Sequence, residues 1–309
     1  MAIKSDRIDV HHHIVPSEYL KALASVGIKT AVGEPFPSWT PEKSIDLMDR
    51  HGIKVAITSI SAPGIYFGDL NFTRTLAREC NEFSARLIKD YPQRFGAFAV
   101  LPIPDIKASL AELKYALDIL MLDGIVLLTN IDGVYLGDPK FNEILSELNQ
   151  RKAIVFVHPS IPPADKLPMT NFRPPILEFV FDTTRAVANL IHSGSIKRYP
   201  DIRFIFSHAG GTVPFLTWRI SFGNKKIINL LKHLYYDIAL AATPYSLNSL
   251  LELVEPTQIL FGTVYTFAPE QVSINMINEF ENYDRLKPQD RTIIERDSAL
   301  ALFPRLNRD

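Results

Sequence analysis

The sequence predicts a distorted (β/α)8 barrel, and two observations support this prediction. Short apolar runs recur along the chain with helix-length amphipathic stretches between them, and histidines stand at the ends of three of those runs. Alternation of this kind is typical of parallel α/β folds, among which a doubly wound sheet is the alternative to a barrel. The histidines favour the barrel, because the carboxyl ends of all its strands meet at one rim.

Eight segments are predicted to be buried parallel strands, since each is a short and mostly apolar run. Eight is the number of strands in a (β/α)8 barrel. In chain order the runs are Ile8–His12, Val55–Ile60, Phe95–Leu101, Gly124–Leu128, Ile154–His158, Phe204–His208, Leu234–Ala239 and Gln258–Gly262.

Amphipathic stretches of helical periodicity lie between these runs. Proline marks several of their boundaries, with Pro139 at a helix start and Pro92 and Pro200 just beyond helix ends. The predicted helices include Thr73–Asp90, Leu110–Met121, Asp138–Gln150 and Arg185–Tyr199, and a closing helix lies within Asp290–Asp309.

Two segments, 32–39 and 159–175, are predicted to be loops. The second contains six prolines, and each segment lies downstream of a strand that carries histidine. Lids over a barrel mouth would occupy such places in the chain.

Composition excludes several classes of protein. The 309 residues are 47% hydrophobic, which is ample for a sizeable core, and no repeat or Gly/Ser linker divides them, so we treat 1–309 as a single domain. A net charge of −1 gives no reason to expect nucleic acid or a membrane surface as a partner. The single cysteine, Cys80, excludes an internal disulfide and is predicted to be a buried structural thiol in a helix. Without a long apolar stretch or a signal-peptide pattern, we expect a cytoplasmic protein.

Three consecutive histidines end the first predicted strand. A strand points alternate side chains to opposite faces, so His11 and His13 share one face while His12 points to the other. Two imidazoles on one face supply half of a metal site, and zinc and related ions accept such donors. We therefore predict that His11 and His13 bind a metal ion.

Further histidines follow two other predicted strands, His158 at the end of the fifth and His208 at the end of the sixth. Imidazoles from His11, His13 and His158 suffice for a catalytic metal centre that keeps open positions for water or substrate. His208 could be a fourth ligand or an unligated general acid or base. We favour the second role, because Ala-Gly-Gly after His208 lets the backbone approach a bound ligand and a proton carrier must stay unligated.

With these residues in place, the chain resembles the amidohydrolase superfamily. More narrowly, it is similar to the branch that contains aminocarboxymuconate semialdehyde decarboxylase and the ortho-hydroxybenzoate decarboxylases, and within it to the 6-methylsalicylate decarboxylases. The match extends over nearly the whole chain. It is carried by Ile8–His13, Asn81-Glu82, Pro92–Phe95, Val157–Pro159, Phe181–Arg185, Phe206–Gly211 with Pro214, and Leu302–Leu306.

The resemblance implies a distorted (β/α)8 barrel with one divalent metal ion, zinc in the first place and manganese as the alternative. It also implies a homodimer or homotetramer. His11, His13 and His158 would be the metal ligands, with His208 beside the metal.

The chain departs from the family pattern after the eighth predicted strand. Family members carry aspartate in a Gly-Thr-Asp-Tyr-Pro-like segment, whereas this chain has Val264 at that position and Thr266 in place of proline. The aspartate ordinarily ligates the metal and is a candidate proton carrier, and valine can do neither. Ser298 stands where the family tends to have asparagine. Asp237, at the end of the seventh predicted strand, is the nearest carboxylate that could substitute, although a plain hydrogen-bonding role at a strand end is the alternative.

The sequence thus predicts a metal-dependent, non-oxidative decarboxylase of a small ortho-hydroxy aromatic carboxylic acid, weakened or inactivated by Val264. A metal-dependent hydrolase of a small lactone or amide, or an inactive metal-containing binding protein, are the alternatives. Arg219 is a candidate for binding the substrate carboxylate, in some relatives from the neighbouring subunit. Phe181 and Trp39 are candidates for contact with the aromatic ring of the substrate.

Overall fold

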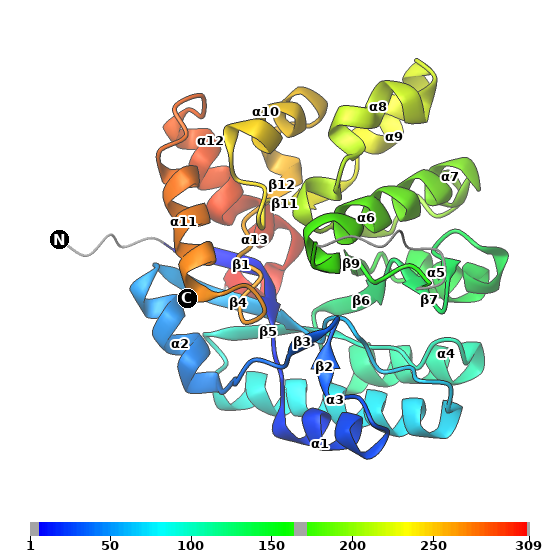
Figure 1. Ribbon diagram of the computed structural model, residues 1–309. Helices are drawn as coiled ribbons and strands as arrows, with labels where there is room; N and C mark the ends of the chain where they lie inside the picture. The colour runs from blue at the N-terminus through cyan, green and yellow to red at the C-terminus, as the bar shows by residue number, and fades with distance from the viewer. Residues whose placement is uncertain (1–5, 164–171, 308–309) are drawn as a thin grey trace.

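Eight parallel strands form the centre of the molecule, and helices surround them (Figure 1). The structure, a computed structural model, describes residues 6–163 and 172–307. Each connection between neighbouring barrel strands contains at least one helix, as the predicted (β/α)8 fold requires. In sheet order the strands are β1 (Arg7–His13), β4 (Ile53–Ser59), β5 (Phe95–Ala99), β6 (Gly124–Leu128), β9 (Ile154–His158), β10 (Arg203–Phe206), β11 (Tyr235–Asp237) and β12 (Ile259–Leu260).

The barrel is closed by the backbone of β1 and of the segment that follows β12. Val10 N donates to Phe261 O over 3.0 Å, and Val264 N donates to His11 O over 2.8 Å. These bonds continue the sheet beyond the two residues of β12 and leave the ends of β1 and β12 side by side. The first and last strands of the chain therefore meet at the same rim.

All eight predicted runs coincide with barrel strands, and β6 and β9 agree at both ends. The sixth run is shorter than predicted, because β10 ends at Phe206 and His208 begins a short 3-10 turn, η4 (His208–Gly210). Apolar character continues past the last ladder hydrogen bond here, so the sequence alone extends the strand too far.

The predicted helices are present, several with clear end signals. For example, Asp69 caps α3 by accepting from Asn71 N and Phe72 N. The helices are α1 (Ser17–Ser25), α2 (Pro41–Arg50), α3 (Leu70–Asp90), α4 (Ile106–Lys114), α5 (Asn142–Gln150), α6 (Pro174–His192), α7 (Ser195–Arg198), α8 (Val213–Ser221), α9 (Lys225–Lys232), α10 (Pro244–Leu253), α11 (Glu270–Glu281), α12 (Pro288–Thr292) and α13 (Ser298–Leu302). The π-helical turns η1 (Tyr115–Ile119) and η6 (Ile293–Asp297) extend α4 and join α12 to α13.

Helix α6 begins at Pro174, so the predicted start at Arg185 is wrong by three turns. Proline lacks only an N–H that the first turn of a helix leaves unpaired, so prolines at 174 and 175 are compatible with a helix start. Of the loop predicted over 159–175, residues 164–171 lie outside the described residues. The predicted loop 32–39 contains a short strand, β3 (Glu34–Pro35), which pairs with β2 (Thr30–Ala31).

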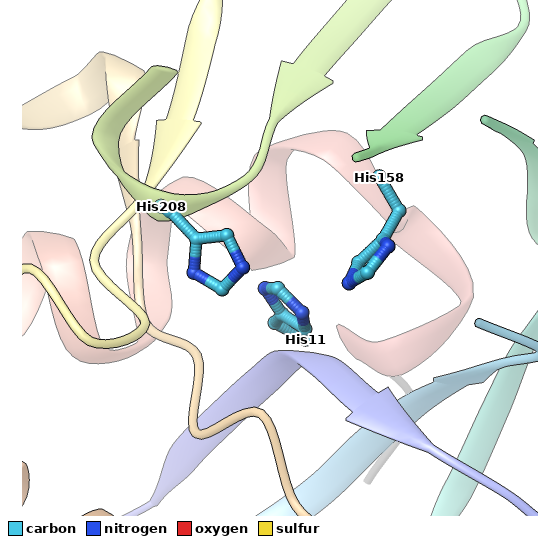
Figure 2. Close-up of side chains that lie close together, drawn as sticks. All are labelled: His11, His158 and His208. Atoms are coloured by element: carbon cyan, nitrogen blue, oxygen red, sulfur yellow. The ribbon is translucent and has the colours of Figure 1, made fainter. Parts of the chain in front are cut away.

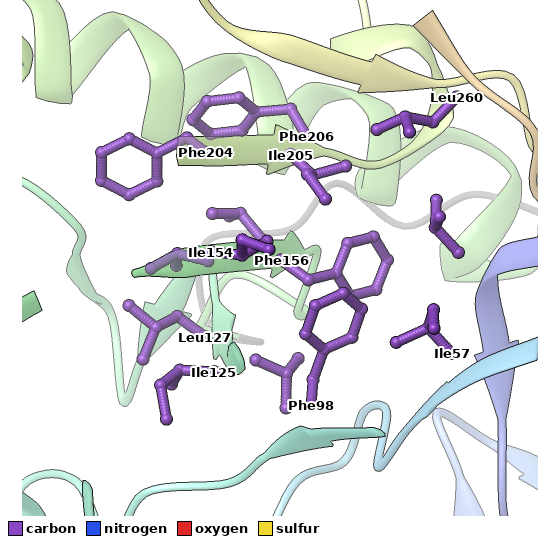
Figure 3. Packing of buried hydrophobic residues seen from close by; sticks show 14 of the residues in the cluster. Ile57, Phe98, Ile125, Leu127, Ile154, Phe156, Phe204, Ile205, Phe206 and Leu260 are labelled. Atoms are coloured by element: carbon purple, nitrogen blue, oxygen red, sulfur yellow. The ribbon is translucent and has the colours of Figure 1, made fainter. Parts of the chain in front are cut away.

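The barrel interior is filled by large apolar side chains (Figure 3). Phe98 of β5 and Phe156 of β9 stack with ring centroids 5.2 Å apart. Because side chains alternate along a strand, Phe156 and His158 of β9 point to the same side, and Phe156 also lies 5.0 Å from the ring of His11. The apolar core therefore forms the floor beneath the histidines.

Cys80 lies buried in α3, as predicted, and its burial raises the pKa of its thiol. Among the described residues, no helix combines the length and the apolar character that crossing a bilayer requires.

Candidate metal centre

Four histidine rings converge at the carboxyl end of the barrel. His11 and His13 come from β1, His158 from the last residue of β9 and His208 from the turn after β10. The ring centroid of His11 lies 4.8 Å from the centroids of His13 and His208 and 5.2 Å from the centroid of His158. All four side chains are buried, and Figure 2 shows three of them facing a common space. The structure thus brings together the four histidines that the sequence selects.

Hydrogen bonds at the outer nitrogen fix the tautomer of three of these rings. The Nδ1 atoms of His158 and His208 lie 2.9 Å from Pro159 O and 3.0 Å from Ala239 O. Nδ1 of His11 lies 2.8 Å from Asp237 Oδ2. Carbonyl and carboxylate oxygens only accept, so each Nδ1 carries the hydrogen and each Nε2 carries a lone pair. Nε2 of His11 lies 3.0 Å from Nε2 of His13, and Nε2 of His158 lies 3.3 Å from Ser61 Oγ.

The same three histidines have one ring nitrogen each within 4.8 Å of one another. Two nitrogens bound to one zinc ion at about 2.1 Å in a tetrahedron are about 3.4 Å apart, so small side-chain rotations would bring these atoms into range. Three buried imidazoles whose ring nitrogens face one common space are a donor set that suits a divalent metal ion. The residues present therefore fit the ion that the sequence predicts.

His13 belongs to the same cluster through His11. Their Nε2 atoms are 3.0 Å apart, and Nδ1 of His13 lies 2.9 Å from Ser59 Oγ. A serine hydroxyl can donate or accept, so this contact leaves the tautomer of His13 open. A separation of 3.0 Å suits either a hydrogen bond between the two rings or two ligands of one ion.

Burial makes these imidazoles difficult to protonate. Loss of solvent, together with the neighbouring histidines, holds the pKa values of His13 and His158 well below their usual range. The same causes lower the pKa of His208 to about 4. At neutral pH these three rings are therefore uncharged, the form in which imidazole binds metals.

Asp237 serves two of the histidines at once. While Oδ2 accepts from His11, Oδ1 accepts from the backbone N–H groups of His208 and Ala239 at 3.0 and 2.9 Å. Of the two roles that the sequence leaves open for Asp237, the structure shows the hydrogen-bonded one. The signal that could have revealed it is the carboxylate partner that metal-binding histidines usually have at their outer nitrogen.

His12 faces away from the cluster, as the alternation of the strand predicts, and joins a separate buried network. Its ring bridges Asp9 Oδ2, 3.0 Å from Nδ1, and Ser44 Oγ, 2.9 Å from Nε2. Trp39, a predicted substrate contact, donates its indole N–H to the same Ser44 oxygen and lies buried. The structure therefore places Trp39 beside α2 and His12, on the side of β1 opposite to the pair His11 and His13.

Position 264 lies directly beside the cluster. The backbone N–H of Val264 donates to His11 O, and its side chain packs against Ala239 and Ala268. Its φ of 63° is in the left-handed region, which β-branched residues rarely adopt and which asparagine and aspartate tolerate better. An apolar side chain therefore occupies a backbone position that suits the aspartate of the family pattern.

Phe179, two residues before the predicted substrate contact Phe181, is the aromatic residue of α6 that lies beside the cluster. Phe179 of α6 lies buried with its ring centroid 5.7 Å from that of His158, whereas Phe181 is 37% exposed. Helical periodicity would have found Phe179, had the start of α6 been placed correctly. Arg219 lies exposed on α8, and no ion pair of it occurs within the described ranges 6–163 and 172–307.

Comparisons with known proteins agree with the predicted family. The model of the amidohydrolase family matches residues 8–305. A decarboxylase of Aspergillus niger, yanB, is 37% identical over 97% of this chain and 88% of its own, and the 6-methylsalicylic acid decarboxylase of Penicillium expansum is 33% identical over 97% of both. A crystal structure described as an amidohydrolase II superposes with a TM-score of 0.91 at 30% identity, covering 97% of this chain and all of that one. The predicted resemblance and fold are confirmed.

Proposed function

The chain belongs to the amidohydrolase family, and on this basis we propose that it is a metal-dependent, non-oxidative decarboxylase of an ortho-hydroxy aromatic carboxylic acid resembling 6-methylsalicylate. The observation that carries the proposal is the buried set of imidazoles at the barrel mouth, three of which have one ring nitrogen each within 4.8 Å of one another. Relatives that match the whole chain are named decarboxylases, which supports this chemistry over hydrolysis.

His11, His13 and His158 are proposed to hold the ion, with His208 next to it. Zinc is the ion that we propose, since nitrogen donors suit it, and manganese is the alternative. A divalent ion bound there would chelate the carboxylate and the ortho hydroxyl of the substrate and stabilise the negative charge on oxygen. Phe179 and Phe267, whose rings lie 5.7 Å from His158 and 5.5 Å from His13, provide apolar walls suited to an aromatic ring.

Decarboxylation requires a proton at the ring carbon that bears the carboxylate, after which the carbon–carbon bond breaks and carbon dioxide leaves. A side chain at position 264 would stand close to His11, but valine has no proton to give. If His208 keeps Nε2 unligated, that atom would first have to take up a proton from solvent and then pass it to the ring carbon, and the low pKa of this imidazole makes the protonated form scarce at neutral pH. Loss of a positioned acid commonly lowers a rate by about 10²–10⁴-fold, so we expect slow turnover.

We also propose that the protein is a homodimer or homotetramer that associates through α8 and α10. Phe215, Trp218 and Phe222 recur at helical spacing at 82%, 71% and 84% exposure, and Tyr245 at the start of α10 is 94% exposed. Large apolar side chains gathered in this way mark a surface that another molecule covers. Arg219 lies on the same helix, in a place from which it could serve a neighbouring subunit.

The test is turnover of 6-methylsalicylate by protein with one equivalent of zinc. Carbon dioxide and 3-methylphenol are the expected products, and in deuterated water one deuterium should appear at the carbon that bore the carboxylate. 4-Hydroxybenzoate is the matched control, because it lacks the ortho hydroxyl needed for chelation. Bound zinc without any product would favour a binding protein, and opening of a lactone without carbon dioxide would favour a hydrolase.

A further inference from the structure

We propose that His208 is itself a metal ligand through Nε2, so that imidazole nitrogens from His11, His13, His158 and His208 hold the ion without any carboxylate. This inference concerns the centre on which the proposed function rests, but it is tested without a substrate. It replaces the proton-carrier role that the sequence favours for His208.

The orientation of His208 supports its role as a ligand. Ala239 O occupies Nδ1, and among the described residues no hydrogen-bond partner faces Nε2. A proton carrier and a ligand both need this free atom, yet only a ligand needs it near the Nε2 atoms of other histidines. One nitrogen of His208 lies within 4.8 Å of a nitrogen of His11 and of one of His158.

The backbone that aims His208 supports the same role. His208 and Ala209 have φ values of 55° and 56°, in a region that side-chain-bearing residues seldom adopt. Such conformations persist only where the surroundings impose them, and they gather at functional sites. The N–H of His208 is held by Asp237, the carboxylate that also orients His11. One side chain thus fixes two imidazoles relative to each other, which a shared ion requires.

Within residues 6–163 and 172–307, the two carboxylates beside the cluster already use both of their oxygens. Asp237 uses both oxygens on His11, His208 and Ala239. Both oxygens of Asp9 are engaged by His11 N, His12 and Thr263. At position 264 the side chain is apolar. Of the side chains that the structure describes, the imidazole of His208 is therefore the one available as a fourth protein ligand.

A metal centre of imidazole nitrogens alone and one that includes a carboxylate differ in their relative affinities for divalent ions. Imidazole suits zinc, copper and nickel, whereas manganese and magnesium favour carboxylate, carbonyl and water oxygens. We therefore expect this centre to discriminate against manganese more strongly than the same centre with aspartate at position 264.

X-ray absorption at the zinc edge of the wild-type protein tests the proposal directly. Four imidazoles per zinc are expected, and three imidazoles with oxygen donors would overturn it. The variant His208→Gln should show one imidazole fewer and bind zinc at least about 10-fold more weakly, since even supporting partners of a ligand contribute about 10–100-fold. His233→Gln, which removes an exposed histidine at the end of α9, is the matched control and should bind zinc like the wild type.

Competition between zinc and manganese in equilibrium dialysis gives a second readout that does not require loss of a histidine. Val264→Asp should lower the preference for zinc over manganese by about 10-fold or more, on the scale by which single groups alter metal affinity. An unchanged preference, or zinc affinity of His208→Gln within twofold of the wild type, would overturn the proposal. Failure of decarboxylation with four imidazoles on zinc would contradict the proposed function alone.

Discussion

Asp237 has two roles, to orient His11 and to stabilise the barrel, and its replacement by asparagine should remove the first role and keep the second. In the wild type, Oδ1 accepts from two backbone N–H groups and Oδ2 accepts from His11. An asparagine keeps both backbone bonds only if its oxygen occupies the Oδ1 position. Its amide then donates toward His11 Nδ1, so the hydrogen of that ring must move to Nε2. The free lone pair would point away from the metal position.

The expected loss in zinc affinity is about 10–100-fold, the range measured when the outer partner of a ligating histidine is changed. This corresponds to about 1.4–2.7 kcal/mol of binding free energy. The unfolding free energy of the metal-free protein should change much less, because both backbone N–H groups keep an acceptor. Asp237→Ala is the contrasting variant. It leaves two buried N–H groups unpaired at about 1–3 kcal/mol each, so it should also destabilise the metal-free protein.

Zinc affinity is measured by competition with a chelator, and stability by urea unfolding of the metal-free proteins. Asp237→Asn should bind zinc weakly while its unfolding midpoint stays close to that of the wild type. Zinc affinity within twofold of the wild type would refute the tautomer argument. Equal destabilisation by asparagine and alanine would show that the carboxylate stabilises the barrel through its charge instead.

Three further changes have defined outcomes. Val264→Asp should increase carbon dioxide release from 6-methylsalicylate by up to about 10²–10⁴-fold, and equal rates would contradict the effect assigned to Val264. The substitution should not lower the stability of the protein, since aspartate tolerates the left-handed backbone at this position. Phe215→Asp, which places a charge in the exposed apolar surface of α8, should convert an oligomer into monomers in light scattering, while Lys225→Asp on α9 should not. Asp182→Ala should lower the unfolding free energy by about 3 kcal/mol or more, because it removes a buried carboxylate that accepts several hydrogen bonds. The donors are the side chains of Thr129, Asn130 and Tyr135 and the backbone N–H of Ser160. An unchanged urea midpoint would show that water replaces the carboxylate as their acceptor.

The strands were predictable because a parallel strand that is buried on both faces is a short and nearly continuous apolar run in the sequence. Strand ends were less so, since they depend on where the partner strand stops, as at Phe206 of β10. Histidines at strand ends could be combined into one site because the closure of the barrel brings those ends together. Their number and residue types are visible in the sequence, but their hydrogen-bond partners are not.

The hydrogen-bond partners of the histidine rings were missed because they are either remote in sequence or backbone carbonyl groups. Asp237 lies 226 residues from His11, and nothing local in the sequence pairs them. The acceptors of His158 and His208 are carbonyl groups, which every residue carries. The position of Phe179 beside His158 depends on a helix that starts at Pro174, whereas the prolines there suggested a loop. Tertiary contacts thus supply what periodicity leaves open.

In the proposed mechanism, valine in place of aspartate at position 264 would affect the chemistry of the site more than its architecture. What position 264 contributes to barrel closure is its backbone N–H, which donates to His11 O whatever side chain is attached. The orientation of His11 comes from Asp237, and those of His158 and His208 come from carbonyl groups, so none depends on an acid at position 264. With valine at position 264, the chain therefore still has a pre-oriented set of imidazoles. Because that set persists, metal binding and turnover can be separated experimentally in this protein, and measurement of the metal centre has to precede any conclusion from a low rate.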